Sequence, residues 1–209
     1  MKKIMDKFKK SIKHNKKLII FLVVLGLAGI VSGSVFIVML NNDDKQLTAN
    51  YINNFMTNLS MGTLDYISAL KNGLINSFTY IISIWLLGLS SIGMPITLFM
   101  YFSKFFVLGF SISAIISNYG IKGCLLSFSY IFPHQIINII ICAFLVLYSL
   151  KVAGRIMICI LRKQKLDFKI ILHNYLQILL ITIVISVLMT LFEVYITPKL
   201  ISVFLPLIK

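Results

Sequence analysis

A turn without charges joins two apolar segments near the middle of this chain. It lies within residues 84–110, IWLLGLSSIGMPITLFMYFSKFFVLGF, and runs from Gly88 to Pro95. The second segment carries one charge, Lys104. Since a spanning helix needs about 20 mostly apolar residues, Lys104 is expected near the middle of a span. An ionisable group there costs a few kcal/mol unless it has a partner or faces water. Lys104 is therefore a candidate functional residue, with snorkelling or pairing inside a helix bundle as the alternative.

The composition predicts an integral membrane protein. Of the 209 residues, 59% are hydrophobic and only 12% are charged, whereas a soluble domain has about 25% charged residues. The net charge of +14 comes mainly from two clusters beside apolar segments, at residues 2–17 and 151–169. That arrangement is typical of membrane orientation and of anionic headgroups rather than of nucleic-acid recognition. The three cysteines are scattered and predict neither a disulfide framework nor a metal motif.

Five segments are predicted to cross the membrane within one transmembrane helical domain, residues 18–209. Their approximate ranges are 18–40, 74–89, 94–116, 133–150 and 170–196. Residues 1–17, with eight lysines and one acid, form a basic cytoplasmic N-terminus. The positive-inside rule places this segment and residues 151–169 on the same, cytoplasmic side. The sequence therefore predicts an all-α polytopic bundle of about five transmembrane helices, with the N-terminus inside and the C-terminus outside.

Small residues in the first predicted span favour close helix packing. Gly29 and Gly33 are four residues apart, and Gly26 lies one turn earlier. Such a strip lets another helix backbone approach closely. We expect an intramolecular contact, with a dimer interface as the alternative.

The polar segment 41–73 is predicted to lie outside the cytoplasm. Within it, apolar residues recur at helical spacing at Tyr51, Phe55 and Leu59, which predicts an amphipathic helix on the membrane surface. A solvated loop is the alternative. The three residues are candidate partner-binding residues. The apolar tail from Thr197 is too short to span and is expected at the same surface.

Pro133 interrupts an apolar stretch, residues 124–150, that is too long for one straight span. We expect a short helix before the proline and a new helix that begins with it. His134 would then lie in the first turn of that helix, where capping or interface contacts are more common than catalysis. Asn138 follows one turn later. One hypothesis is that Lys104 donates to backbone carbonyls freed near Pro133.

No catalytic or metal-binding motif is present in the sequence. Residues 88–93 and 109–113 each lack the G-x-S-x-G spacing of a nucleophile turn. The histidines lack the i, i+4 partner that two metal ligands on one helix face need. Glu193 is the one acid within a predicted span, and it lies near the end of that span. A proton-coupled pump usually needs a carboxylate inside the membrane, so the lack of other such acids argues against this class. We expect no enzymatic activity, no cofactor and no bound metal.

The order of these features resembles the stage II sporulation protein M family. The resemblance rests on the basic N-terminus, the five spans and the positions of glycine and proline between and within them. These are Gly93-x-Pro95 before the Lys104 span, Gly109-Phe110 within it, and Pro133-His134 at the start of the fourth span. Broader relatives have Pro-His-Gly followed by a Glu on that span. Here Gln135 and Asn138 stand at those two positions, so the acidic group is missing.

The resemblance implies a membrane scaffold without catalysis of its own. Family members anchor two cell-wall hydrolases, stage II sporulation proteins D and P, at the sporulation septum of bacteria that form endospores. There the hydrolases degrade septal peptidoglycan during forespore engulfment. The implied location is the bacterial cell membrane, on the mother-cell side of the septum. The alternative is a small membrane transporter or channel, with Lys104 and the Pro133-His134 break lining its path.

Overall fold

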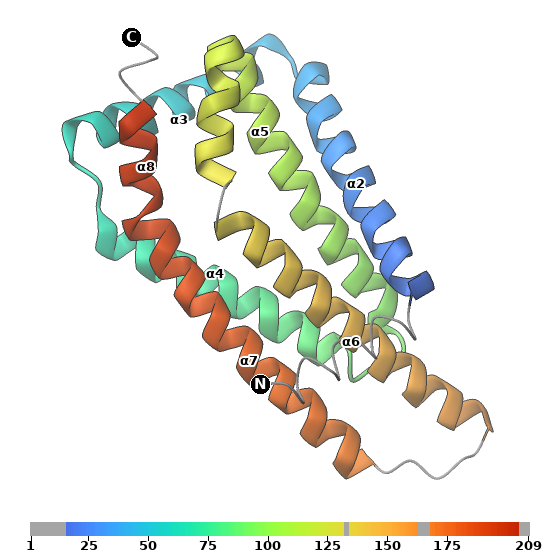
Figure 1. Cartoon of the computed structure of the whole chain (residues 1–209). Coiled ribbons are helices and arrows are strands. Elements are labelled where there is room, and N and C mark those ends of the chain that lie inside the picture. Colours follow the sequence, from blue (N-terminus) through green and yellow to red (C-terminus); the bar gives the residue numbers. More distant parts are fainter. Residues whose placement is uncertain (1–15, 132–133, 163–167, 205–209) are drawn as a thin grey trace.

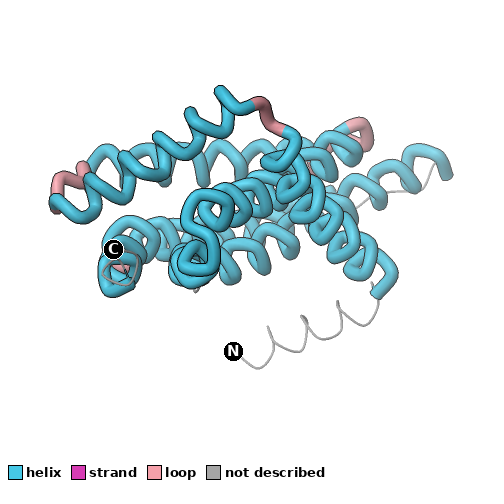
Figure 2. Tube along the Cα trace, turned by 90° about the horizontal axis from the view of Figure 1, so that it is seen from above, coloured by secondary structure: helices cyan, strands magenta, loops and turns pink. Residues whose placement is uncertain are grey.

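The computed structural model describes residues 16–131, 134–162 and 168–204. Within these ranges the regular structure is helical, and short loops join the helices (Figure 2). Four helical stretches are long and apolar enough to cross a membrane. The predicted class, an all-α helical membrane bundle, is confirmed.

Seven labelled helices follow one another along the described chain (Figure 1). They are α2 (Lys16–Met39), α3 (Asn42–Met61), α4 (Tyr66–Leu87), α5 (Gly93–Ile131), α6 (His134–Arg162), α7 (Phe168–Tyr195) and α8 (Thr197–Phe204). The four candidate spans lie in α2, α5, α6 and the stretch from α7 into α8. Because the first half of α4 contains Lys71, Asn72 and Asn76, this helix falls outside that set, and the number of five spans stays a prediction.

The helix α4 begins earlier than the predicted span at residue 74. Its N-cap is Asp65, whose Oδ1 accepts hydrogen bonds from the backbone amides of Ile67 at 3.2 Å and Ser68 at 3.1 Å. A capping carboxylate satisfies amides that have no partner inside the helix. The preceding helix α3 ends at Gly62, which has φ of 68°, a conformation that glycine adopts without strain.

The glycine strip of α2 lies directly against α5. A Cβ atom on Gly29 would stand 2.9 Å from the carbonyl oxygen of Phe102, and one on Gly33 would collide with the carbonyl of Phe106. In the opposite direction, a Cβ on Gly109 would collide with the backbone of Ile30. The two helices therefore pack backbone to backbone, and the strip serves an intramolecular contact.

The helix α5 folds back on itself at Gly120, where φ is 59° and ψ is −137°. Its second arm runs beside the end of the first, since the Ser127 hydroxyl donates to the carbonyl of Ile112 at 3.4 Å. A single glycine makes this turn, and the second arm is a short helix in the stretch before Pro133, as expected. The next helix, α6, is described from His134, which lies in its first described turn. Pro133 lies outside the described residues.

Different elements lie at the two ends of the bundle. At one end lie α3, the Gly120 turn and α8, and at the other lie the adjoining ends of α6 and α7 (Figure 1). The first end is held together by a buried apolar cluster of Leu59, Ile115, Leu126 and Ile201. The side-chain oxygen Oδ1 of Asn53 accepts hydrogen bonds from the side-chain amide of Asn118 at 2.9 Å and from the Tyr119 hydroxyl at 2.8 Å.

Near the other end, hydroxyl groups fix the turn that follows α4. Ser149 of α6 donates to the carbonyl of Ile84 at 3.1 Å. Tyr175 of α7 donates to the carbonyl of Trp85 at 3.1 Å. These bonds hold the end of α4 against two neighbouring helices, and the turn then leads into the helix that carries Lys104.

Candidate functional site

Lys104 lies in the interior of the bundle, on the arm of α5 before Gly120. It is half-buried, and its Nζ stands 4.4 Å from the centre of the Tyr80 ring on α4. An ammonium over an aromatic face gains about 2 kcal/mol when the pair is desolvated. The charge that the sequence places in mid-span therefore has a partner on the neighbouring helix.

Polar side chains from three more helices surround this cation, and together they form what we call the Lys104 cluster. Its members are Lys104 of α5, Ser77 and Tyr80 of α4, Asn138 and Cys142 of α6, and Thr182 and Ser186 of α7. The cluster lines a void of about 10 Å³. A void of that size holds about one water molecule.

Hydrogen bonds within and beside the cluster link the helices to one another. The Tyr80 hydroxyl lies 3.1 Å from the Cys142 sulfur and donates to the carbonyl of Met100 at 3.4 Å. The Ser77 and Thr190 hydroxyl oxygens are 3.5 Å apart. Interhelical hydrogen bonds between membrane helices contribute about 0.6 kcal/mol each on average. These hydrogen bonds thus connect α4 to α5, α6 and α7 near the middle of the bundle.

An acid completes the electrostatics of the site. Glu193 of α7 lies three residues beyond Thr190, and its carboxyl interacts electrostatically with Lys104. Opposite charges attract strongly where water is scarce. The cation of α5 therefore acts electrostatically on the one acid in the last predicted span.

A family model described as "Stage II sporulation protein M" matches residues 18–198. The chain belongs to the stage II sporulation protein M family. With its apolar helices, this makes it a sporulation-related membrane protein. Neither a curated protein nor a solved structure matches it.

Asn138 occupies the position at which the resemblance described above implies a Glu in broader relatives. This residue lies in the Lys104 cluster, so an amide stands near the cation in place of an acid. His134 begins α6, and the hypothesis that Lys104 bonds to carbonyls near Pro133 falls outside the described residues. The described partners of Lys104 are Tyr80 and Glu193.

The glycine and proline positions of the family pattern act in packing and turns. Gly93 begins α5, and a Cβ there would collide with the carbonyl of Leu87 across the turn. Pro95 lies in the first turn of α5, where its missing N–H leaves no helical hydrogen bond unmade. Neither residue lines the void beside Lys104.

A stripe of buried polar residues on α7 was not predicted from the sequence. Tyr175, Thr182, Ser186 and Thr190 are all buried, and Thr182, Ser186 and Thr190 recur every four residues. Small hydroxyl residues at this spacing in an apolar helix are a known signal of a helix–helix interface in membranes. The signal was present, but the apolar residues around it dominate the sequence.

The three candidate partner-binding residues of α3 have different surroundings. Tyr51 is 76% exposed and Phe55 is 39% exposed, whereas Leu59 is buried in the cluster at that end of the bundle. Leu47, one turn before Tyr51, is also exposed. We call Leu47, Tyr51 and Phe55 the exposed strip, and Leu59 belongs to the packed face of the same helix.

Proposed function

We propose that this protein is a membrane scaffold that recruits cell-wall hydrolases to the sporulation septum during forespore engulfment, without catalysis of its own. Membership of the stage II sporulation protein M family supports the proposal. On this proposal its partners are the family's hydrolases, stage II sporulation proteins D and P. Its location is the mother-cell membrane, with the basic end of the bundle in the cytoplasm and α3 outside.

The exposed strip of α3 is the observation that carries this proposal. The helix already packs one apolar face on the bundle, through Ile52, Met56 and Leu59. Leu47, Tyr51 and Phe55 form a second apolar line that no other part of the described chain covers. Exposed aromatic residues are enriched at protein interfaces. The strip lies at the end of the molecule that would face the septal wall.

The transporter or channel alternative finds less support. Its path would pass Lys104, where the void admits about one water. Tyr80 and Glu193 both interact with this cation, which favours a structural role.

The test is a double variant, Tyr51→Ser with Phe55→Ser, in sporulating cells. We expect normal membrane levels but loss of hydrolase capture in a tagged pull-down, and dispersed hydrolases by fluorescence microscopy. The matched control, Gln46→Ser with Asn54→Ser, changes two exposed polar residues of the same helix and should recruit normally. Normal recruitment by the Tyr51/Phe55 variant would refute the docking surface.

A further inference from the structure

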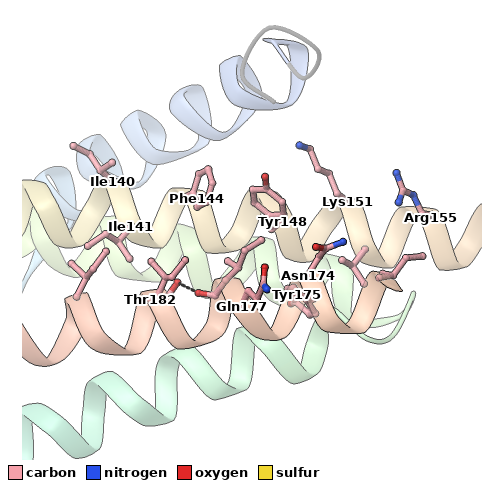
Figure 3. Close-up of a pocket in the computed structure, with 15 residues that line it drawn as sticks. Ile140, Ile141, Phe144, Tyr148, Lys151, Arg155, Asn174, Tyr175, Gln177 and Thr182 are labelled. Atoms are coloured by element: carbon pink, nitrogen blue, oxygen red, sulfur yellow. Dashed lines mark hydrogen bonds between the residues drawn. The ribbon is translucent and has the colours of Figure 1, made fainter. Parts of the chain in front are cut away.

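A half-open groove of about 590 Å³ lies between α6 and α7 (Figure 3). Its volume falls within the range of about 300–1,000 Å³ that is usual for ligand sites. Most of its wall is apolar, with Ile140, Phe144 and Tyr148 from α6 and Ile178, Ile181 and Ile185 from α7. This groove is separate from the void beside Lys104, although Ile141 and Thr182 line both.

One end of the groove is polar and basic. Lys151 and Arg155 of α6 and Asn174 and Gln177 of α7 line this part of the groove. The Lys151 ammonium stands 4.8 Å from the centre of the Tyr148 ring. Because Arg155 follows Lys151 by one helical turn, the two cations repel each other. An anion between them would relieve this repulsion.

The length of the apolar wall matches one leaflet of a bilayer. Eleven residues separate Ile140 from Lys151 (151 − 140), which corresponds to about 16 Å at 1.5 Å per helical residue. The hydrocarbon core of a bilayer is about 30 Å thick, so one leaflet contributes about 15 Å. A partner's spanning helix would need a groove of the full thickness, whereas a lipid needs only this half.

The basic end also lies at a level suited to headgroups. Tyr175 stacks on Trp85 there, with ring centres 5.5 Å apart, and bonds to the Trp85 carbonyl. Trp and Tyr are enriched at the boundary between hydrocarbon and headgroups. Basic pockets between spanning helices bind anionic headgroups at this boundary.

We propose that the groove between α6 and α7 binds one anionic glycerophospholipid. Its phosphate lies against Lys151, Arg155 and Asn174, and an acyl chain runs along Tyr148, Phe144 and Ile140. The lipid fills the open side of the α6–α7 pair.

The test is native mass spectrometry of the full chain in detergent, titrated with phosphatidylglycerol or phosphatidylcholine of the same acyl chains. We expect tighter binding of phosphatidylglycerol. Each cation near a membrane surface contributes about 1 kcal/mol to anionic lipid binding, or about fivefold. Lys151→Gln with Arg155→Gln should therefore weaken phosphatidylglycerol binding about 25-fold and leave phosphatidylcholine binding unchanged.

The matched control is Arg162→Gln with Lys169→Gln, which removes the same charge from exposed residues outside the groove. It should bind phosphatidylglycerol like the unmodified chain. A second variant, Ile140→Trp, narrows the apolar end at an exposed position and should weaken long-chain phosphatidylglycerol. Equal binding of both lipids, an equal loss in the control, or full displacement of the lipid by inorganic phosphate would each overturn the proposal.

Discussion

Lys104 illustrates how single residues of this protein depend on their surroundings. An isolated charge inside a membrane bundle is unfavourable, yet Lys104 is positioned over the Tyr80 ring and interacts with Glu193. Removing one of two opposite charges that interact inside a bundle leaves the other without that compensation, whereas removing both does not. The two residues should therefore behave as a unit.

A double-mutant cycle tests this coupling. Lys104→Met should cost up to about 2 kcal/mol of stability because the Tyr80 ring loses the cation above it, and because the charge that acts on Glu193 is removed. In a chain of this size a loss of about 2 kcal/mol lowers the melting temperature by about 4–8 °C, measured by thermal unfolding in detergent. Lys104→Met with Glu193→Gln should recover part of the loss. Additive losses in the double variant would show that the two groups are not coupled.

The cap of α4 gives a pH-dependent prediction. Hydrogen bonds from Ser68, first its side chain and then its amide, and from Ile67 lower the pKa of Asp65. A carboxyl whose folded pKa is depressed stabilises the fold above its unfolded pKa of about 3.9. That contribution is lost as pH falls through the folded pKa.

Hydrogen exchange at the first turn of α4 measures this effect. Protection of the Ser68 amide should stay constant in the unmodified protein above about pH 5 and decrease as pH falls below about 4, after correction for the intrinsic exchange rate. Asp65→Asn keeps a capping oxygen without a titrating group, so its protection should not change with pH. A variant with the same pH profile as the unmodified chain would contradict the assignment.

At the scale of helices, the contact between α2 and α5 depends on the absence of side chains. Gly29, Gly33 and Gly109 leave space for the facing backbone. Close backbone contact lets dispersion and weak hydrogen bonds act where the hydrophobic effect does not operate. The α2–α5 contact therefore has no room for an added side-chain atom at these glycines unless the two helices move apart.

Gly33→Ala tests the α2–α5 contact, with Gly154→Ala as its control. The added methyl would collide with the Phe106 carbonyl in the first case and meets no atom within 4 Å in the second. Overpacking typically costs about 1–3 kcal/mol, whereas alanine in a helix gains up to about 1 kcal/mol over glycine. Thermal unfolding should show a lower melting temperature for Gly33→Ala only. Equal effects of the two substitutions would contradict a backbone-to-backbone contact.

The whole molecule is electrically asymmetric. Lys16 and Lys17 start α2 at the end where Arg162 and Lys169 flank the α6–α7 connection. At the end with α3, the lysines Lys45, Lys71, Lys122 and Lys199 are offset by Asp43, Asp44 and Asp65. Basic residues are retained on the cytoplasmic side during insertion. The basic end is therefore expected to face the cytoplasm.

Cysteine labelling in intact cells tests this orientation. In a background with Cys124→Ser and Cys159→Ser, and with the buried Cys142 retained, Asn54→Cys should react with an impermeant maleimide. Arg162→Cys should react only after the membrane is permeabilised, because it lies at the basic end. The reverse pattern, read by gel shift, would invert the topology.

Much of the fold could be predicted from the sequence because its strongest signals are local. Apolar runs longer than a bilayer core set the spans of α2, α5 and α7, and Pro133 indicated a new helix, α6, which is described from His134. Local signals were less reliable where polar residues mixed with apolar ones. The α4 start at Tyr66 was missed, and a connection was expected over several residues where Gly120 alone makes the turn.

By itself, the sequence determined the membrane class, the charge asymmetry, and the presence of an ionisable group at mid-span, because composition and periodicity alone set these properties. Only the tertiary structure decided which residues surround Lys104, that Leu59 is buried while Tyr51 is exposed, and that a basic groove opens between α6 and α7. Lys104 and Glu193 are far apart in the chain, and no local rule says which helices become neighbours. That choice follows from side-chain packing between helices, which is a property of the assembled bundle.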